Sequence, residues 1–143
     1  MILGAALTTD GRRLILRQAV RDDAADLIRA VDSVSRERCF FLRSSFEMDV
    51  ELERTFIAES RRRGDLILLA IVGRELGGWV MLLRHKQEFR RHAAQLGIGV
   101  LPEYRGLGVG RALMTTTLEW AAQNRLERVD LSVRATNTRA RGL

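Results

Sequence analysis

Hydrophobic and polar residues follow two different periods along this chain, and the changes of period divide it into strands and helices. The apolar run at 66–72 is typical of a buried strand, and alternation of apolar with small or polar residues predicts a strand at 94–101. Apolar and polar residues alternate again at 128–134. With two further segments, the expected strands are 13–19, 66–72, 79–83, 94–101 and 128–134.

Three other segments carry apolar residues at three- and four-residue steps, which is the period of an amphipathic helix. Asp22 or Asp23 can cap the first helix, and Asp49 can cap the second, which should end at Gly64. The third helix covers 108–124. The residues expected to face the core are Leu27, Ile28, Val31 and Val34 on the first helix, and Leu52, Phe56 and Ile57 on the second.

The resulting order, β-α-α-β-β-β-α-β, predicts a mixed α/β domain with one strand–helix–strand crossover. The chain has 143 residues, 46% of them hydrophobic, which is enough for one core. Its apolar runs are too short to span a bilayer, and the apolar segment 1–7 lacks the charged start of a signal peptide. The single cysteine, Cys39, rules out an internal disulfide. We therefore expect a cytoplasmic protein that does not enter a membrane.

The formal net charge of +6 raises the question of nucleic-acid binding. Apart from Arg61–Arg63 and Arg90-Arg91, the basic residues are scattered and are not interleaved with aromatic residues. We expect most of them to lie on solvated faces and a minority to attract anionic phosphates. A basic nucleic-acid-binding domain is therefore the third interpretation of the chain, after the two given below.

The stretch 95–113 combines a strand, a proline, a glycine-rich turn and the start of a helix. Pro102 ends the strand because it has no backbone N–H. The turn at 105–111 brings three glycines to a helix end whose N–H groups lack intrahelical partners and whose dipole is positive. Glycines leave these N–H groups accessible, so the stretch predicts a site for phosphate or pyrophosphate, to which Arg105 and Arg111 add charge.

The same residues resemble a motif of the GNAT N-acetyltransferase superfamily. Its signature, (R/Q)-x-x-G-x-(G/A), matches Arg105, Gly108 and Gly110, and 100–104 matches the usual lead-in V-x-P-x-(Y/F). A P-loop would need a Lys after the glycines, and the third glycine of a dinucleotide-binding fingerprint falls on Arg111. The resemblance implies a GNAT-like fold, a central mixed sheet with helices on both faces, and acetyl-CoA as co-substrate without a metal.

In that family, the strand before the loop and the last strand predicted here splay apart around the pantetheine arm of coenzyme A. By position, the N–H of Val100 would stabilise the oxyanion of the tetrahedral intermediate, and Ile98 and Gly99 would lie beside the pantetheine. The loop would hold the pyrophosphate. The remaining cofactor contacts that the resemblance implies are Arg105, Gly106, Leu107, Gly108, Val109, Gly110, Arg111 and Asn137.

Several residues are candidates for the base that deprotonates the acceptor amine. Many family members have a Glu at the position of Gln95, and an amide cannot take up a proton at neutral pH. His92 has a suitable pKa, Glu88 precedes the strand and Glu103 follows it. A water molecule oriented by Gln95 is an equally good alternative. Residues 36–48 are a candidate for acceptor specificity.

The acid that protonates the leaving thiolate is expected beyond the last residue. Residues 136–143 resemble the family segment N-x-x-A-x-x-L-Y, whose Tyr has this role and would follow Leu143. We therefore expect a single GNAT-like domain over 1–143 that is incomplete at its C-terminus, without the last helix and final strands. Its edge at 128–134 would carry unpaired backbone groups, which favours a homodimer.

The function expected from the sequence is acyl transfer from acetyl-CoA to a primary amine of a small molecule or protein. The alternative is a non-catalytic acyl-CoA-binding module, which Gln95 and the missing Tyr both favour. Neither interpretation identifies the acceptor amine.

Overall fold

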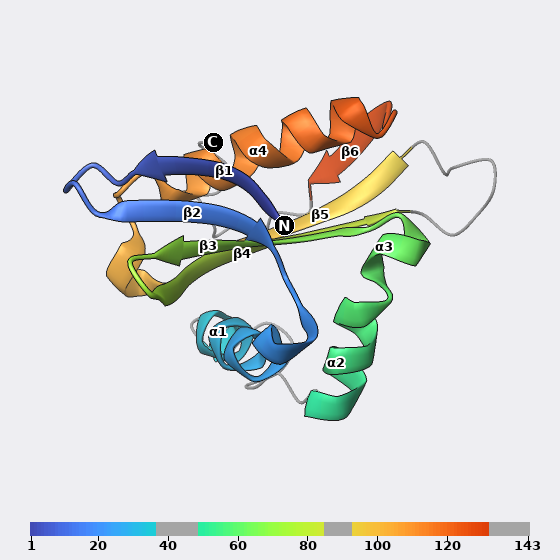
Figure 1. Ribbon diagram of the computed structural model, residues 1–143, viewed down its shortest axis with the longest axis horizontal. Coiled ribbons are helices and arrows are strands. Elements are labelled where there is room, and N and C mark those ends of the chain that lie inside the picture. Colours follow the sequence, from blue (N-terminus) through green and yellow to red (C-terminus); the bar gives the residue numbers. More distant parts are fainter. Residues whose placement is uncertain (37–48, 85–92, 132–143) are drawn as a thin grey trace.

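The computed structural model describes residues 1–36, 49–84 and 93–131 (Figure 1). Its strands are β1 (Ile2–Leu7), β2 (Arg13–Gln18), β3 (Leu66–Val72), β4 (Glu75–Arg84), β5 (Ala93–Val100) and β6 (Arg128–Leu131). Its helices are α1 (Ala24–Arg36), α2 (Val50–Ala58), α3 (Ser60–Arg63) and α4 (Val109–Gln123), with two short helical turns, η1 (Arg21–Asp23) and η3 (Pro102–Tyr104). No helix within these ranges has both the length and the hydropathy that a membrane crossing needs.

The six strands form one sheet in the order β1-β2-β3-β4-β5-β6. Neighbouring strands from β1 to β5 are antiparallel, and β6 is parallel to β5. A parallel pair needs a crossover, and α4 supplies it. Figure 1 shows α4 on one side of the sheet and α1 and α2 on the other. The mixed α/β sheet flanked by helices on both faces, predicted from the sequence, is confirmed.

Each face of the sheet has its own hydrophobic core. The core under α4 includes Leu66 and Leu68 of β3, and the core under α1 includes Ile67 and Leu69 of the same strand. All four side chains are at most 2% exposed. The continuous apolar run at 66–72 is thus explained, because β3 is buried on both faces.

The structure has one strand, β1, that the hydrophobic pattern did not predict. β1 is at the edge of the sheet and pairs with β2, which is the strand expected at 13–19. Its side chains at Ile2 and Leu7 are 62% and 71% exposed. Because β1 has no alternation between a buried and an exposed face, its sequence lacks the period-two signal on which the prediction relied.

The segment expected to be one helix after Asp49 consists of α2 and α3, which meet at Glu59. Asp49 caps α2 as predicted, accepting from two backbone N–H groups. The predicted inward face was wrong at Leu52, whose side chain is 65% exposed. Glu53 is buried instead, because it lies one helical turn before the buried Ile57 and shares its face.

Two adjacent glycines in β4 allow the segment after β5 to pack closely on the sheet. The register of β3 and β4 shifts at Gly77, which is the extra residue of a bulge. A Cβ on Gly77 would lie 3.1 Å from Tyr104 Cγ of η3. A Cβ on Gly78 would lie 3.1 Å from Leu113 Cδ1 of α4. Side chains at either position would therefore push η3 or α4 away from the sheet.

Gly99 of β5 is required by the side chain of Trp79 on β4. The two residues are directly opposite, and a Cβ on Gly99 would lie 2.4 Å from both Cζ2 and Cη2 of the indole. Trp79 belongs to the core under α1, so Gly99 faces that side of the sheet. The small residue that the sequence associated with the cofactor thus has a packing explanation.

We predict that Gly99→Ala destabilises the domain by about 1–3 kcal/mol, because an overpacked core must shift the Trp79 ring. Gly97→Ala is the matched control, since it lies on the same strand and face and its Cβ would meet nothing within 4 Å. That control should lose no stability. Urea denaturation of both variants checks the prediction, and equal midpoints would contradict it.

Candidate functional site

The hydrogen bonding of β5 directs its N–H groups alternately toward β4 and away from it. Val100 lies opposite Gly78, and the N–H of the next residue, Leu101, donates to the Gly77 carbonyl at 2.9 Å. Hydrogen-bonded and non-hydrogen-bonded pairs alternate in an antiparallel ladder, so Val100 and Gly78 form a non-hydrogen-bonded pair. The N–H groups of Val100 and of Ile98 therefore point away from β4, toward the other edge of β5.

The described residues of β6 pair with the first half of that other edge. The parallel register joins 93–96 to 128–131, whereas β5 continues to Val100. Within the described ranges, residues 97–100 have a ladder partner on the β4 side alone. Two sequence candidates, Ile98 and Val100, thus lie at this edge with their N–H groups directed outward.

The chain then leads directly from β5 to the first turn of α4. After η3 it passes through Gly106 and Gly108, both in the left-handed conformation with φ of 78° and 87°. Gly108 precedes α4 and offers no side-chain cap. The first backbone hydrogen bond of the helix runs from the Ala112 N–H to the Gly108 carbonyl at 3.0 Å. The N–H groups of 109–111 precede that bond, at the positive end of the helix dipole.

The residues of this turn fit a pyrophosphate. Gly106, Gly108 and the side chain of Arg111 are exposed, so an anion can approach both the backbone and a cation. Arg105 donates from Nε to the Val100 carbonyl at 2.9 Å and so ties the turn to the end of β5. The sequence candidates from 105 to 111 are therefore contiguous with the edge that carries Ile98 and Val100.

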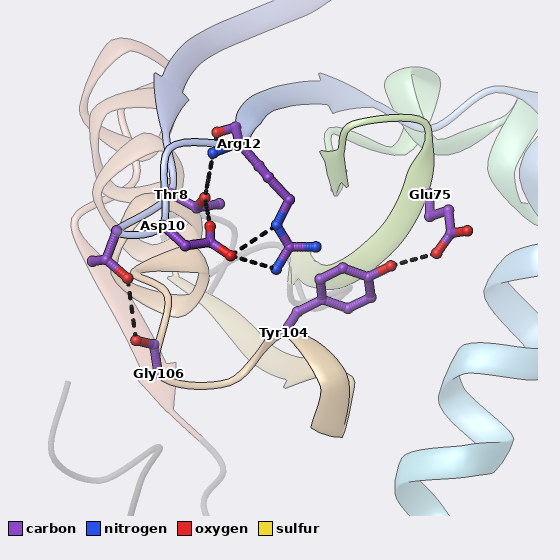
Figure 2. A network of polar contacts seen from close by, with 7 residues as sticks. Thr8, Asp10, Arg12, Glu75, Tyr104 and Gly106 are labelled. Atoms are coloured by element: carbon purple, nitrogen blue, oxygen red, sulfur yellow. Dashed lines mark hydrogen bonds and ion pairs between the residues drawn. The ribbon is translucent and has the colours of Figure 1, made fainter.

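Tyr104 has a structural role beside this turn. Its side chain is 7% exposed, and its hydroxyl donates to Glu75 Oε2 at 2.5 Å (Figure 2). The hydrogen bond to Glu75 and burial both raise the pKa of the Tyr104 hydroxyl. Because that proton is held by Glu75, at the start of β4, Tyr104 fixes η3 on the sheet.

Gln95 lies on the face of β5 that is covered by α1. It shares this face with Gly97 and Gly99 because alternate residues of a strand point the same way, and its side chain is exposed. It precedes Val100 by five positions, which is about 16 Å along a strand. Gln95 therefore reaches a group at the Val100 N–H only through intervening water.

Three of the sequence candidates lie outside the described residues: His92, Glu88 and Asn137. The candidate specificity segment 36–48 also lies outside them, except for its first residue. The remaining candidate base, Glu103, is in η3 and is exposed. The described residues contain no group of three or more His, Cys, Asp or Glu side chains that could hold a metal ion.

Glu53 is an ionisable residue that the sequence analysis missed. Its side chain is 1% exposed, and its Oε2 atom has no hydrogen-bond partner among the residues that the structure describes. Burial alone raises the pKa of this carboxyl. The signal in the sequence was its spacing of four from Ile57, since two such residues share one face of a helix. Glu53 thus places a carboxyl in the helical layer that covers the Gln95 face of the sheet.

Comparison of the sequence with models of protein families identifies the family over most of the chain. A model described as the acetyltransferase (GNAT) family matches residues 30–143. The chain belongs to the GNAT acetyltransferase family. No sequence among the curated proteins matches it.

Solved structures share its fold. A GNAT-family acetyltransferase from Streptococcus pneumoniae has a TM-score of 0.82 and 26% identity, covering 90% of this chain and 80% of its own. A ribosomal-protein-alanine N-acetyltransferase from Brucella melitensis has a TM-score of 0.78 and 20% identity, covering 89% and 78%. The acetyltransferase yncA from Salmonella typhimurium, solved with acetyl-CoA, has a TM-score of 0.80 and 14% identity, covering 90% and 75%.

We predict that Glu53→Gln makes the domain more stable relative to the parent as pH rises. A raised pKa means that the folded state holds the proton more tightly than the unfolded chain, so the parent loses stability as pH rises from about 4.5 through the folded pKa. The amide has no such titration. The melting temperatures of the variant and the parent are compared between pH 4 and pH 8. A difference between them that is constant over this range would show that folding does not raise the pKa of Glu53.

Proposed function

We propose that this GNAT-family domain transfers the acetyl group of acetyl-CoA to a primary amine. The observation that carries the proposal is the continuity of two features. The outward-facing N–H groups at the end of β5 lead directly into the glycine turn at the start of α4. Acetyl-CoA has a thioester at one end of its pantetheine arm and a pyrophosphate at the other. The thioester matches the N–H groups at the end of β5, and the pyrophosphate matches the glycine turn.

The turn at 105–111 would hold the pyrophosphate with backbone N–H groups and the positive end of α4. The pantetheine arm would run along the outer edge of β5, where its amides can pair with the backbone as an added strand would. The thioester carbonyl would then lie at the Val100 N–H. That N–H would stabilise the oxyanion formed when the amine attacks the carbonyl carbon, before the carbon–sulfur bond breaks and the thiolate leaves.

The acceptor must lose a proton, because an alkylammonium ion has no lone pair to attack with. A water molecule oriented by Gln95, or His92, would take that proton. The Brucella enzyme acts, by its name, on the alanine of a ribosomal protein. At 20% identity it supports the fold and the general chemistry of an amine acceptor, while the acceptor of this chain stays open as a small molecule or a protein.

The second candidate is a binding module that holds acyl-CoA without transferring the acyl group. Gln95 favours it, because an amide at this position cannot accept a proton. Mass spectrometry of the protein with acetyl-CoA and a mixed panel of amines separates the two candidates. An acetylated amine supports transfer, cofactor binding without any product supports the module, and the absence of cofactor binding overturns both.

We predict that Gly108→Ala weakens coenzyme A binding by at least about tenfold, or ~1.4 kcal/mol. An alanine disfavours the φ of 87° at this position, so the backbone relaxes and the first N–H groups of α4 turn away from the pyrophosphate. Gly73→Ala is the control, because Gly73 also has a positive φ but lies in the turn between β3 and β4. Calorimetry measures both variants, and unchanged affinity in a folded Gly108→Ala protein would place the cofactor elsewhere.

We predict that the transfer rate rises with pH through an apparent pKa near 6.5 if His92 is the base. His92→Ala should then remove this limb of the pH profile, and His85→Ala, which removes the other histidine of the chain, should leave the limb in place. If the limb survives in His92→Ala, the water oriented by Gln95 is the remaining route. Gln95→Leu should then slow transfer at every pH while leaving cofactor affinity unchanged.

A further inference from the structure

The turn between β1 and β2 lies against the glycine turn that precedes α4. Figure 2 shows the first turn, with Thr8, Asp10 and Arg12, beside Gly106 of the second. The Thr9 N–H donates to the Leu107 carbonyl at 3.0 Å, and its hydroxyl lies 3.5 Å from the Gly106 carbonyl. The two turns are almost a hundred residues apart in the sequence, so only the folded sheet brings them together.

The β1–β2 turn is itself held in a defined shape. Thr8 is 4% exposed, and its N–H donates to the Arg12 carbonyl at 2.8 Å. The Arg12 N–H donates in return to the Thr8 hydroxyl at 2.9 Å, and the Gly11 N–H donates to the Thr8 carbonyl at 2.9 Å. The Thr8 hydroxyl also donates to Asp10. Thr9 therefore lies in a turn whose conformation is fixed by hydrogen bonds between its own residues.

A second contact joins the same two segments. The guanidinium of Arg12 forms an ion pair with Asp10 at 3.0 Å and lies 5.5 Å from the ring centroid of Tyr104 (Figure 2). Tyr104 immediately precedes the glycine turn and is fixed at its other end by Glu75. The cation over the aromatic face is attractive, so Arg12 holds η3 as Thr9 holds the turn that follows it.

We propose that Thr9 is a positioning residue for the pyrophosphate turn, acting through its hydrogen bond to the Leu107 carbonyl. The inference rests on the proposed binding of coenzyme A. It assigns part of the cofactor site to the β1–β2 hairpin, which precedes the residues 30–143 that the family model matches.

Thr9 can orient the Gly108 N–H through the Leu107 carbonyl because the peptide bond between Leu107 and Gly108 is planar. In a trans peptide, the carbonyl of one residue and the N–H of the next point in opposite directions, and the described chain has no cis peptide. With the Leu107 carbonyl held toward Thr9, the N–H of Gly108 must point away from the hairpin. Thr9 therefore fixes the direction of a donor at the cofactor turn without touching the cofactor.

The turn needs this restraint because of its glycines. Gly106 and Gly108, on either side of Leu107, both have positive φ, and a Cβ added to either would meet at most one atom, Thr9 Cγ2, within 4 Å. A glycine also occupies other backbone conformations readily, so the peptides next to Leu107 can rotate at little cost. A rotation that turned the Leu107 carbonyl toward a pyrophosphate would repel it. The hydrogen bond from Thr9 opposes that rotation.

The decisive experiment removes the Thr9 N–H alone. The chain has one cysteine, Cys39, so residues 1–38 can be synthesised with an ester in place of the amide at Thr9 and ligated to 39–143. The dissociation constant for coenzyme A, measured by calorimetry, should rise about three- to tenfold, the range expected for one lost backbone hydrogen bond. Thr9→Pro removes the same N–H in an ordinary recombinant protein and should change affinity in the same direction.

Two controls separate positioning from general stability. Asp23→Asn weakens the double hydrogen bond from Arg17 near the other end of β2, at 2.7 and 2.9 Å, and should lower the melting temperature without changing coenzyme A affinity. S-acetylpantetheine has no pyrophosphate, so its affinity, followed by NMR titration, should be the same in the ester variant and the parent. Loss of both ligands in the ester variant would indicate general damage and overturn the inference.

The outcomes distinguish this inference from the proposed function. If the parent protein does not bind coenzyme A, the proposed function fails and the inference fails with it. If the parent binds and both Thr9 variants bind equally well, the inference alone is overturned. A loss confined to coenzyme A supports the positioning role of Thr9.

Discussion

The candidate site depends on the direction of the backbone N–H groups along β5. At 93–96 both edges of β5 are paired with described strands. At the end of β5, the alternation of an antiparallel ladder directs the N–H groups of Ile98 and Val100 away from β4. An extended ligand that has amide groups of its own can form hydrogen bonds with the backbone of such an edge. The proposed location of the cofactor therefore rests on hydrogen-bond parity, independently of side-chain chemistry.

Close packing at glycines holds the cofactor turn against that edge. Gly77 and Gly78 let η3 and α4 approach β4 at distances that a side chain would prevent, and Gly99 accommodates the indole of Trp79. These glycines have a different role from Gly106 and Gly108, which shape the exposed turn itself. Glycine thus has two uses here, one in packing the sheet against its helices and one in shaping the exposed turn that we propose as the pyrophosphate site.

Paired ionisable groups lie on both faces of the sheet. On the α4 side, the network from Asp10 through Arg12 and Tyr104 to Glu75 is paired and fixes structure. On the α1 side, Arg17 is paired with Asp23, whereas Glu53 is buried with an oxygen that has no partner among the described residues. An unpaired buried carboxyl costs stability, so Glu53 is a polar group that packing does not require.

The sequence by itself determined the type of fold, because the hydrophobic pattern is a local signal. A continuous apolar run identified β3, alternation identified β5 and three- to four-residue steps identified α4, while the strand–proline–glycine order predicts an anion site at 105–111. Tertiary structure decided what no local pattern records. β1 has no alternation because both its faces are largely exposed, Glu53 rather than Leu52 is buried because α2 packs with a different rotation, and Gly99 is glycine because Trp79 lies opposite. The contact of Thr9 with Leu107 joins residues that only the sheet brings together, so it could not be read from the sequence.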